Sequence, residues 1–279
     1  MGQNEDFRPL HDQLACIQNP AFGLGKEKHI RIHLGVERFL TRFPNAPLWS
    51  GVGVQLPSVH HRTGYSFYLR YAEEGIFRKV VPGAGYGYYF NLGKYGQHQV
   101  TLGAGLEVVS NSINQIKIIG DAGDPLTQDN FLSYSSIIPI RAVNYQLANR
   151  YSGNTFDFGL VARKGFGFNR SLTLLAHVMG ELKMNRTVVF TPGLYASISN
   201  AKNICEIRAD LKFIRVLSVG VSYLTDQRFG FHFSLPLDIV YNEDHRVDVG
   251  FRFVFQPPHL IPIGGTSFGV AVNYGVERG

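Results

Sequence analysis

The chain has 279 residues, of which 44% are apolar and only 17% are charged, and its formal net charge is +6. Charged residues make up about a quarter of an average soluble domain, so polar surface is scarce here. Because no run of about 18 apolar residues occurs, a transmembrane helix is excluded. The basic residues are spread singly and without a recognition motif, which argues against a nucleic-acid partner.

The first 27 residues lack any alternation of apolar and polar side chains, and we expect them to form an N-terminal arm tucked against or inside the remaining fold. Asn19-Pro20 and the glycines that follow indicate turns. The polar start carries no signal peptide, which fits either a soluble cytoplasmic protein or the processed chain of an exported one. Cys16 and Cys205 are compatible with one disulfide bridge or with two free thiols.

From residue 28 to residue 279, apolar and polar residues alternate with a period of two, which is typical of β-strands with two unlike faces. The clearest stretch is His245 to Gln256, where valines and phenylalanines alternate with charged residues and glycine. The alternation predicts strands over residues 28–37, 49–56, 64–71, 83–90, 99–108, 137–147, 156–163, 172–178, 188–198, 203–213, 217–223, 228–239, 245–256 and 268–276.

These strands are long and their connections are mostly short. Tilted membrane-spanning strands need about 9 to 11 residues, whereas strands of soluble proteins cluster near 5 or 6. Short connections force neighbouring strands to be antiparallel, and an even number of them closes into a barrel. The sequence therefore predicts an all-β fold, a transmembrane antiparallel up-and-down β-barrel of about 14 strands over residues 28–279, preceded by the arm over residues 1–27.

An unpaired backbone cannot cross hydrocarbon, so a sheet can span a membrane only if it closes. In such a barrel the apolar rows face lipid, and the rows of charged residues and glycine face the bore. The sharpest case is residues 203–213, whose four charges alternate in sign. The candidates for bore-facing residues are Glu206, Arg208, Asp210, Lys212, Arg228, Asp238, Arg246, Asp248 and Arg252. A soluble barrel with the charges outside is disfavoured, because these side chains could not fill an interior enclosed by so many strands.

No set of residues in the sequence points to catalysis. The glycine-rich stretch 83–87 precedes no helix start, so it does not predict a nucleotide loop. A Gly-x-Ser-x-Gly nucleophile elbow does not occur, and His29 and His33 lie too far apart along a strand to favour one metal ion. We therefore expect no enzymatic activity, no catalytic residue, no cofactor and no metal.

Residues 18–23, 156–160, 190–194 and 216–223 carry motifs that point to one family. Together they resemble the PorP/SprF family of outer-membrane proteins, which belong to the type IX secretion system of the Bacteroidetes. Residues 18–23, Gln-Asn-Pro-Ala-Phe-Gly, resemble the family's signature before its first strand. Residues 156–160 resemble its middle hairpin, residues 190–194 its strand with an internal proline, and residues 216–223 its Leu-x-Val-Gly-x-Ser-Tyr strand. The similarity extends over most of the chain.

The resemblance implies a non-enzymatic outer-membrane barrel that docks or anchors a partner in protein secretion and gliding. The implied partners are a secreted surface protein, a periplasmic peptidoglycan-binding component, and the lipid and lipopolysaccharide of the membrane. Only Asn19, Pro20, Ala21 and Phe22 match the family's motif, and we expect them to seat the arm. Two alternatives remain: a porin or solute transporter, suggested by the charged inner rows, and an outer-membrane hydrolase, for which the sequence offers no nucleophile constellation.

Overall fold

The computed structural model describes residue 21 and residues 29–38, 47–58, 62–74, 77–93, 98–113, 140–166, 172–200, 203–214, 216–237, 245–255 and 266–277. Within these ranges no helix has the length and apolar character to cross a membrane. The described residues form fourteen long strands and one two-residue strand, β9, beside the β8–β10 turn. The strands are β1 His29–Arg38, β2 Leu48–Ser58, β3 Thr63–Glu74, β4 Phe77–Leu92, β5 His98–Ile113, β6 Ile140–Ser152, β7 Phe156–Phe166, β8 Leu172–Gly180, β9 Leu182–Lys183, β10 Val188–Ser199, β11 Asn203–Phe213, β12 Leu217–Leu224, β13 Phe229–Leu237, β14 His245–Phe255 and β15 Thr266–Glu277.

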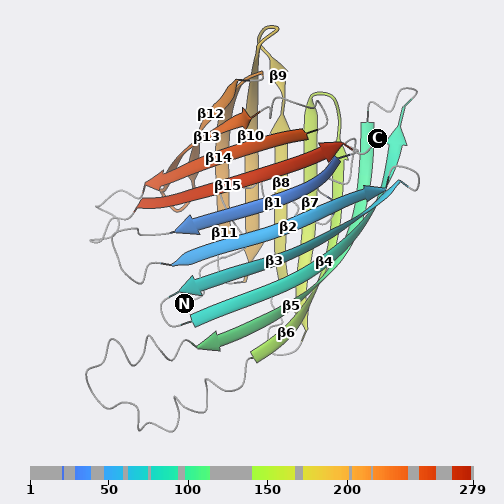
Figure 1. Ribbon diagram of the computed structural model, residues 1–279, viewed down its shortest axis with the longest axis vertical. Coiled ribbons are helices and arrows are strands. Elements are labelled where there is room, and N and C mark those ends of the chain that lie inside the picture. The colour runs from blue at the N-terminus through green and yellow to red at the C-terminus, as the bar shows by residue number, and fades with distance from the viewer. Residues whose placement is uncertain are drawn as a thin grey trace.

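The strands close into a barrel (Figure 1). Each long strand pairs antiparallel with the next along the chain. The first strand, β1, pairs with the last, β15, from His29 opposite Glu277 to Arg38 opposite Phe268. Because none of the described long strands is left with a free edge, their backbone ladders are paired within the protein, as hydrocarbon requires. The predicted all-β, up-and-down barrel of about 14 strands is confirmed.

The largest departures from the predicted strands lie in β4 to β6, and β4 begins at Phe77, six residues earlier than predicted. β5 continues to Ile113 through a run of serine and asparagine, and β6 begins at Ile140 and continues to Ser152. Local hydropathy underestimates the length of these strands, because their polar ends are extended by hydrogen bonding to a neighbouring strand. Lys79 and Val80 of β4, for example, lie opposite Asn111 and Ser110 of β5. A long neighbouring strand therefore extends a segment whose own side chains are polar.

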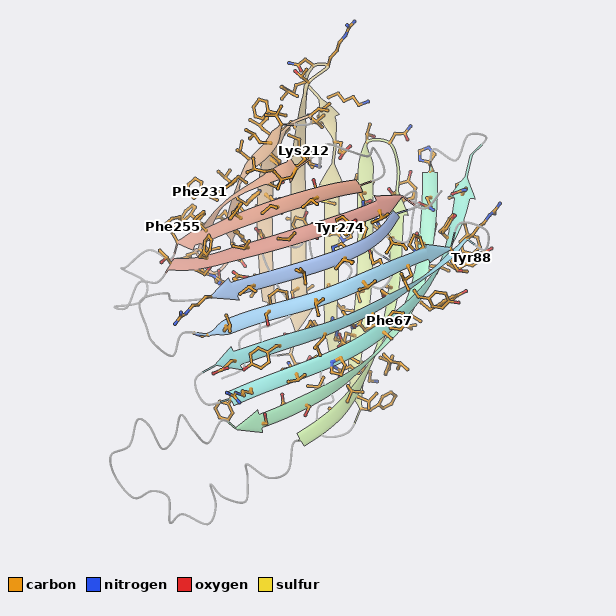
Figure 2. All side chains as sticks on the ribbon, viewed as in Figure 1. Phe67, Tyr88, Lys212, Phe231, Phe255 and Tyr274 are labelled. Atoms are coloured by element: carbon orange, nitrogen blue, oxygen red, sulfur yellow. The ribbon has the colours of Figure 1, made fainter. Side chains whose placement is uncertain are left out.

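The outer surface is apolar, as predicted. In β14, Phe253 and Phe255 are 38% and 43% exposed, while Arg252 and Val254, which alternate with them, are buried. Phe67, Phe231 and Phe255 stand on the outside of the wall (Figure 2). An outward face of exposed leucine, valine and phenylalanine is the surface that a lipid bilayer solvates.

The barrel has two unlike ends. Both chain ends of the barrel, the start of β1 and the end of β15, lie at one of them, which we call the short-turn end. The opposite end, which we call the long-connection end, carries the connections 39–47, 114–139 and 256–265. Aromatic pairs mark its outer rim, including Tyr223 with Phe229 at 5.0 Å between ring centroids and Phe253 with Phe268 at 5.0 Å. Such rims are the aromatic girdles of membrane barrels.

Candidate functional site

On the inner wall, large polar side chains lie across glycines of the neighbouring strand. A Cβ on Gly83 of β4 would come within 2.3 Å of the Tyr68 ring of β3. A Cβ on Gly159 of β7 would come within 2.2 Å of the His177 ring of β8. The alternating glycines of the sequence thus provide the space in which inward side chains reach partners along the wall rather than project into the bore.

The first polar cluster surrounds Glu107 of β5, whose side chain is completely buried. Arg70 donates a hydrogen bond to its Oε1 at 2.5 Å, and the Tyr68 hydroxyl donates to the same oxygen at 2.8 Å. Asn144 of β6 donates to Oε2 at 3.3 Å, and the guanidinium of Arg163 of β7 lies 3.3 Å from Oε2. One buried carboxylate therefore joins β3, β5, β6 and β7, with two cations compensating its charge.

Replacing Gly83 by alanine tests how this cluster depends on the glycine below it. The new methyl group would overlap the Tyr68 ring and displace its hydroxyl from Glu107. Overpacking of this kind costs about 1–3 kcal/mol, so we expect the free energy of unfolding to fall by that amount. The measurement is urea titration in lipid vesicles. The control is Ala84→Val on the exposed face of the same strand, and equal losses in both variants would contradict the explanation.

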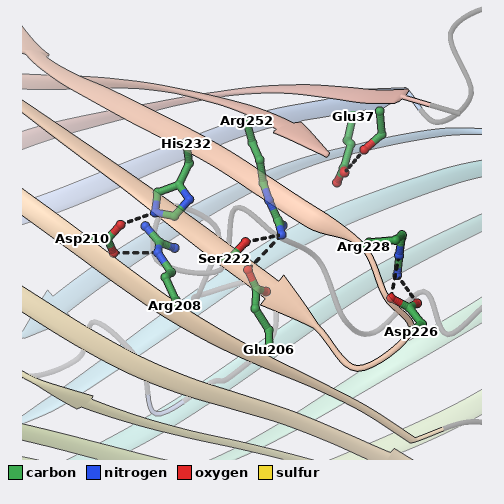
Figure 3. A network of polar contacts seen from close by, with 10 residues as sticks. Glu37, Glu206, Arg208, Asp210, Ser222, Asp226, Arg228, His232 and Arg252 are labelled. Carbon is green, nitrogen blue, oxygen red and sulfur yellow. Dashed lines mark hydrogen bonds and ion pairs between the residues drawn. The ribbon is translucent and has the colours of Figure 1, made fainter. Parts of the chain in front are cut away.

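The second polar cluster lies on β11 to β14 (Figure 3). Arg252 of β14 donates to Glu206 of β11 at 2.9 Å and to Ser222 of β12 at 3.3 Å. Asp210 of β11 accepts a hydrogen bond from Arg208 at 2.6 Å and pairs with the His232 ring of β13. The Arg252 and Glu206 side chains are 1% and 3% exposed, so the pair is sheltered from bulk water.

Smaller polar contacts continue around the wall. Asp157 of β7 accepts from Arg150 of β6 at 2.6 Å and bonds to His177 of β8 at 2.9 Å. On the far side, the His33 ring of β1 lies 2.7 Å from the Asn273 side-chain oxygen of β15. The ionic inner wall is therefore internally paired over much of its circumference.

The structure brings four of the predicted bore-facing residues together: Glu206, Arg208, Asp210 and Arg252 form the second cluster. Lys212 lies at the end of β11, 43% exposed, and pairs with Glu181 at 3.3 Å.

The remaining predicted residues lie nearer the strand ends or beyond the described part of the chain. Arg228 pairs with Asp226 in the β12–β13 connection at 2.6 Å. Asp248 is half-buried in β14. Arg246 lies in the same strand, but its side chain, like the whole of Asp238, falls outside the described residues.

Sequence reasoning did not single out Tyr68, Arg70, Arg163 and His177, which complete the inner clusters. The signal was present, because Tyr68, Arg70 and Arg163 share their strand face with an inward glycine, and His177 lies opposite Gly159 of the neighbouring strand. Among the motif residues, Ala21 is described and fully buried; Asn19, Pro20 and Phe22 lie outside the described residues. Among the described side chains, no group of three or more His, Cys, Asp or Glu could hold a metal ion.

A closed antiparallel barrel with an apolar exterior, aromatic rims and a buried ionic interior is an outer-membrane β-barrel. The family model for the type IX secretion system membrane protein PorP/SprF matches residues 15–276, so the chain belongs to this family. The resemblance seen in the sequence and the predicted outer-membrane location are confirmed. No curated protein matches the sequence.

Three solved structures show the same fold at low sequence identity. The toluene transporter TodX of Pseudomonas putida is 11% identical, with a TM-score of 0.58 over 95% of this chain and 93% of that one. The toluene transporter TbuX of Ralstonia pickettii is 9% identical, with a TM-score of 0.58 over 96% and 94%. The CymD monoaromatic hydrocarbon channel is 9% identical, with a TM-score of 0.57 over 95% and 93%. At these identities the likeness concerns the fold alone.

Proposed function

We propose that this barrel is a non-enzymatic docking or anchoring subunit of type IX secretion, which holds a secreted surface protein or a periplasmic peptidoglycan-binding component at the outer membrane. Membership of the PorP/SprF family supports the general role in secretion. The observation that carries the anchoring role is the burial of ion pairs inside the wall. The side chains of Glu107, Glu206 and Arg252 are each at most 3% exposed, whereas charges that line an open aqueous channel would be solvated.

These ion pairs also join strands that are not neighbours. Arg252 of β14 reaches Glu206 of β11 across two intervening strands, and Arg70 of β3 reaches Glu107 of β5 across one. Adjacent strands lie about 4.8 Å apart, so such pairs bridge roughly 10–14 Å of curved wall. Bracing of this kind resists deformation of the barrel, which suits a subunit that transmits load between a surface protein and the periplasm.

The two ends of the barrel suggest where each partner binds. Outer-membrane barrels carry long connections outside the cell and short turns in the periplasm. The connections 39–47, 114–139 and 256–265 would then meet a secreted surface protein. The short-turn end, which carries the β8–β10 turn, would meet a periplasmic component.

Affinity purification from the native outer membrane tests the proposal, with a tag following residue 279. We expect secretion components to co-purify with the full chain. Replacing residues 114–139 by a short Gly-Ser linker is expected to abolish capture of the surface protein. The matched control replaces residues 238–244 at the opposite end and is expected to retain it. Recovery of the barrel alone from all three preparations would contradict the anchoring role.

The alternative, a porin or solute transporter, makes a different prediction for the same purified barrel. The similarity of fold to three hydrocarbon transporters and channels is compatible with transport. In vesicles that contain the barrel and no partner protein, a transporter would let a solute gradient dissipate across the membrane. An anchor would leave the gradient in place.

A further inference from the structure

One residue of the N-terminal arm, Ala21, is enclosed by the inner wall of the barrel. Its side chain is 0% exposed, and it packs with Ala148 of β6, Val161 of β7 and Leu175 of β8. A Cβ on Gly103 of β5 would lie 2.8 Å from the Ala21 backbone nitrogen and 3.1 Å from its Cα. The backbone of the arm therefore approaches β5 more closely than any side chain other than hydrogen would allow.

The residues around Ala21 form a single line across the sheet. Gly103 lies opposite Ala148, Ala148 opposite Val161, and Val161 opposite Leu175. The line continues in one direction to Gly87 and Gly64 and in the other to Ser197 and Ile204. We call this line the neutral row; its members are Gly64, Gly87, Gly103, Ala148, Val161, Leu175, Ser197 and Ile204.

The rows on either side of the neutral row are polar. Two residues toward the long-connection end, Gln146 lies opposite Arg163. Two residues toward the short-turn end, Arg150 lies opposite Gly159, which lies opposite His177. The neutral row is therefore an uncharged line across an otherwise ionic wall. It consists of glycine at its β3 end and of mostly apolar side chains toward its β11 end. Such a strip suits an extended, small-residue backbone, which packs on glycine and alanine and needs no counter-ion.

We propose that the neutral row is a binding seat for the chain's own N-terminal arm, which it holds at Ala21. Gly103 is the point of closest approach and decides whether the arm can dock. The inference concerns the chain's own arm and does not depend on a secretion partner, so it stands or fails separately from the anchoring role.

Disulfide trapping tests the seat directly. Ala21→Cys and Ala148→Cys are combined in a chain whose Cys16 and Cys205 are replaced by serine. Ala148 packs with Ala21 in the same buried cluster and already carries a Cβ, so the new cysteine leaves Gly103 unchanged below the arm. We expect mass spectrometry of the oxidised, digested barrel to find the linked 21–148 peptide in most molecules.

The control pairs Ala21→Cys with Ser234→Cys, which lies on the same face of β13 as the buried His232, on a different part of the wall. We expect it to yield less than a tenth of the linked product. Equal linkage in both pairs, or none at residue 148, would overturn the seat.

Discussion

Replacing Arg252 by methionine is expected to lower the free energy of unfolding of the barrel by about 3–5 kcal/mol, because the substitution leaves the Glu206 carboxylate buried without its cation. The guanidinium donates to Glu206 at 2.9 Å and to Ser222 at 3.3 Å, so both acceptors lose a partner. Methionine keeps most of the volume, which limits the contribution of a cavity to the loss. Charge, rather than packing, therefore dominates the expected effect.

The measurement is a reversible denaturant titration in lipid vesicles, followed by the fluorescence of the single tryptophan, Trp49, which is buried. The double variant Arg252→Met with Glu206→Gln removes both charges and is expected to recover more than half of the lost stability. If the double variant is no more stable than Arg252→Met alone, the pair is not the source of the loss. That result would also weaken the argument that buried ion pairs brace the wall.

The faces of the strands could be predicted from the sequence because a strand repeats every two residues. Once one residue of a strand is placed, the side of every other residue follows. In β3 this placed Phe67 outside and Arg70 inside, as the structure has them. The rule needs no knowledge of distant residues, which is why it extended over nearly the whole barrel.

The contacts within the bore could not be predicted in the same way. Arg252 and Glu206 are separated by two further strands, and their meeting depends on the register of three successive hairpins and on the curvature of the wall. Glu107 and Arg70 likewise meet across β4. Alternation along a strand shows which face of the sheet a side chain occupies, but not which residues of other strands it contacts. The sequence therefore predicted bore-facing residues but not the ion pairs between them.

The N-terminal motif shows the same limit. The resemblance to PorP/SprF proteins selected Ala21 as one residue that seats the arm, and its burial agrees with such a role. Its neighbours Gly103, Ala148 and Leu175 could be found only once the four successive strands β5 to β8 were paired in register. A glycine on an alternating strand has many structural explanations, and only the approach of another backbone distinguishes this one.

Replacing Leu147 by arginine is expected to cost about 2–4 kcal/mol of stability in vesicles, because the side chain is exposed on the lipid face near the middle of β6. Leu147 lies opposite Ala104 and Ala162, which are small. Its removal therefore loses little packing against the neighbouring strands, and nearly all of the expected cost comes from placing a charge in hydrocarbon.

The matched control is Phe156→Arg, at the first residue of β7 near the short-turn end. An arginine there reaches the head-group region, so we expect a cost of about 0–1 kcal/mol. The difference between the two positions measures the depth of Leu147 in the bilayer. In detergent micelles, which adapt around a charge, both costs should shrink. If Leu147→Arg were as mild as Phe156→Arg in vesicles, the apolar face of β6 would not lie in the bilayer core.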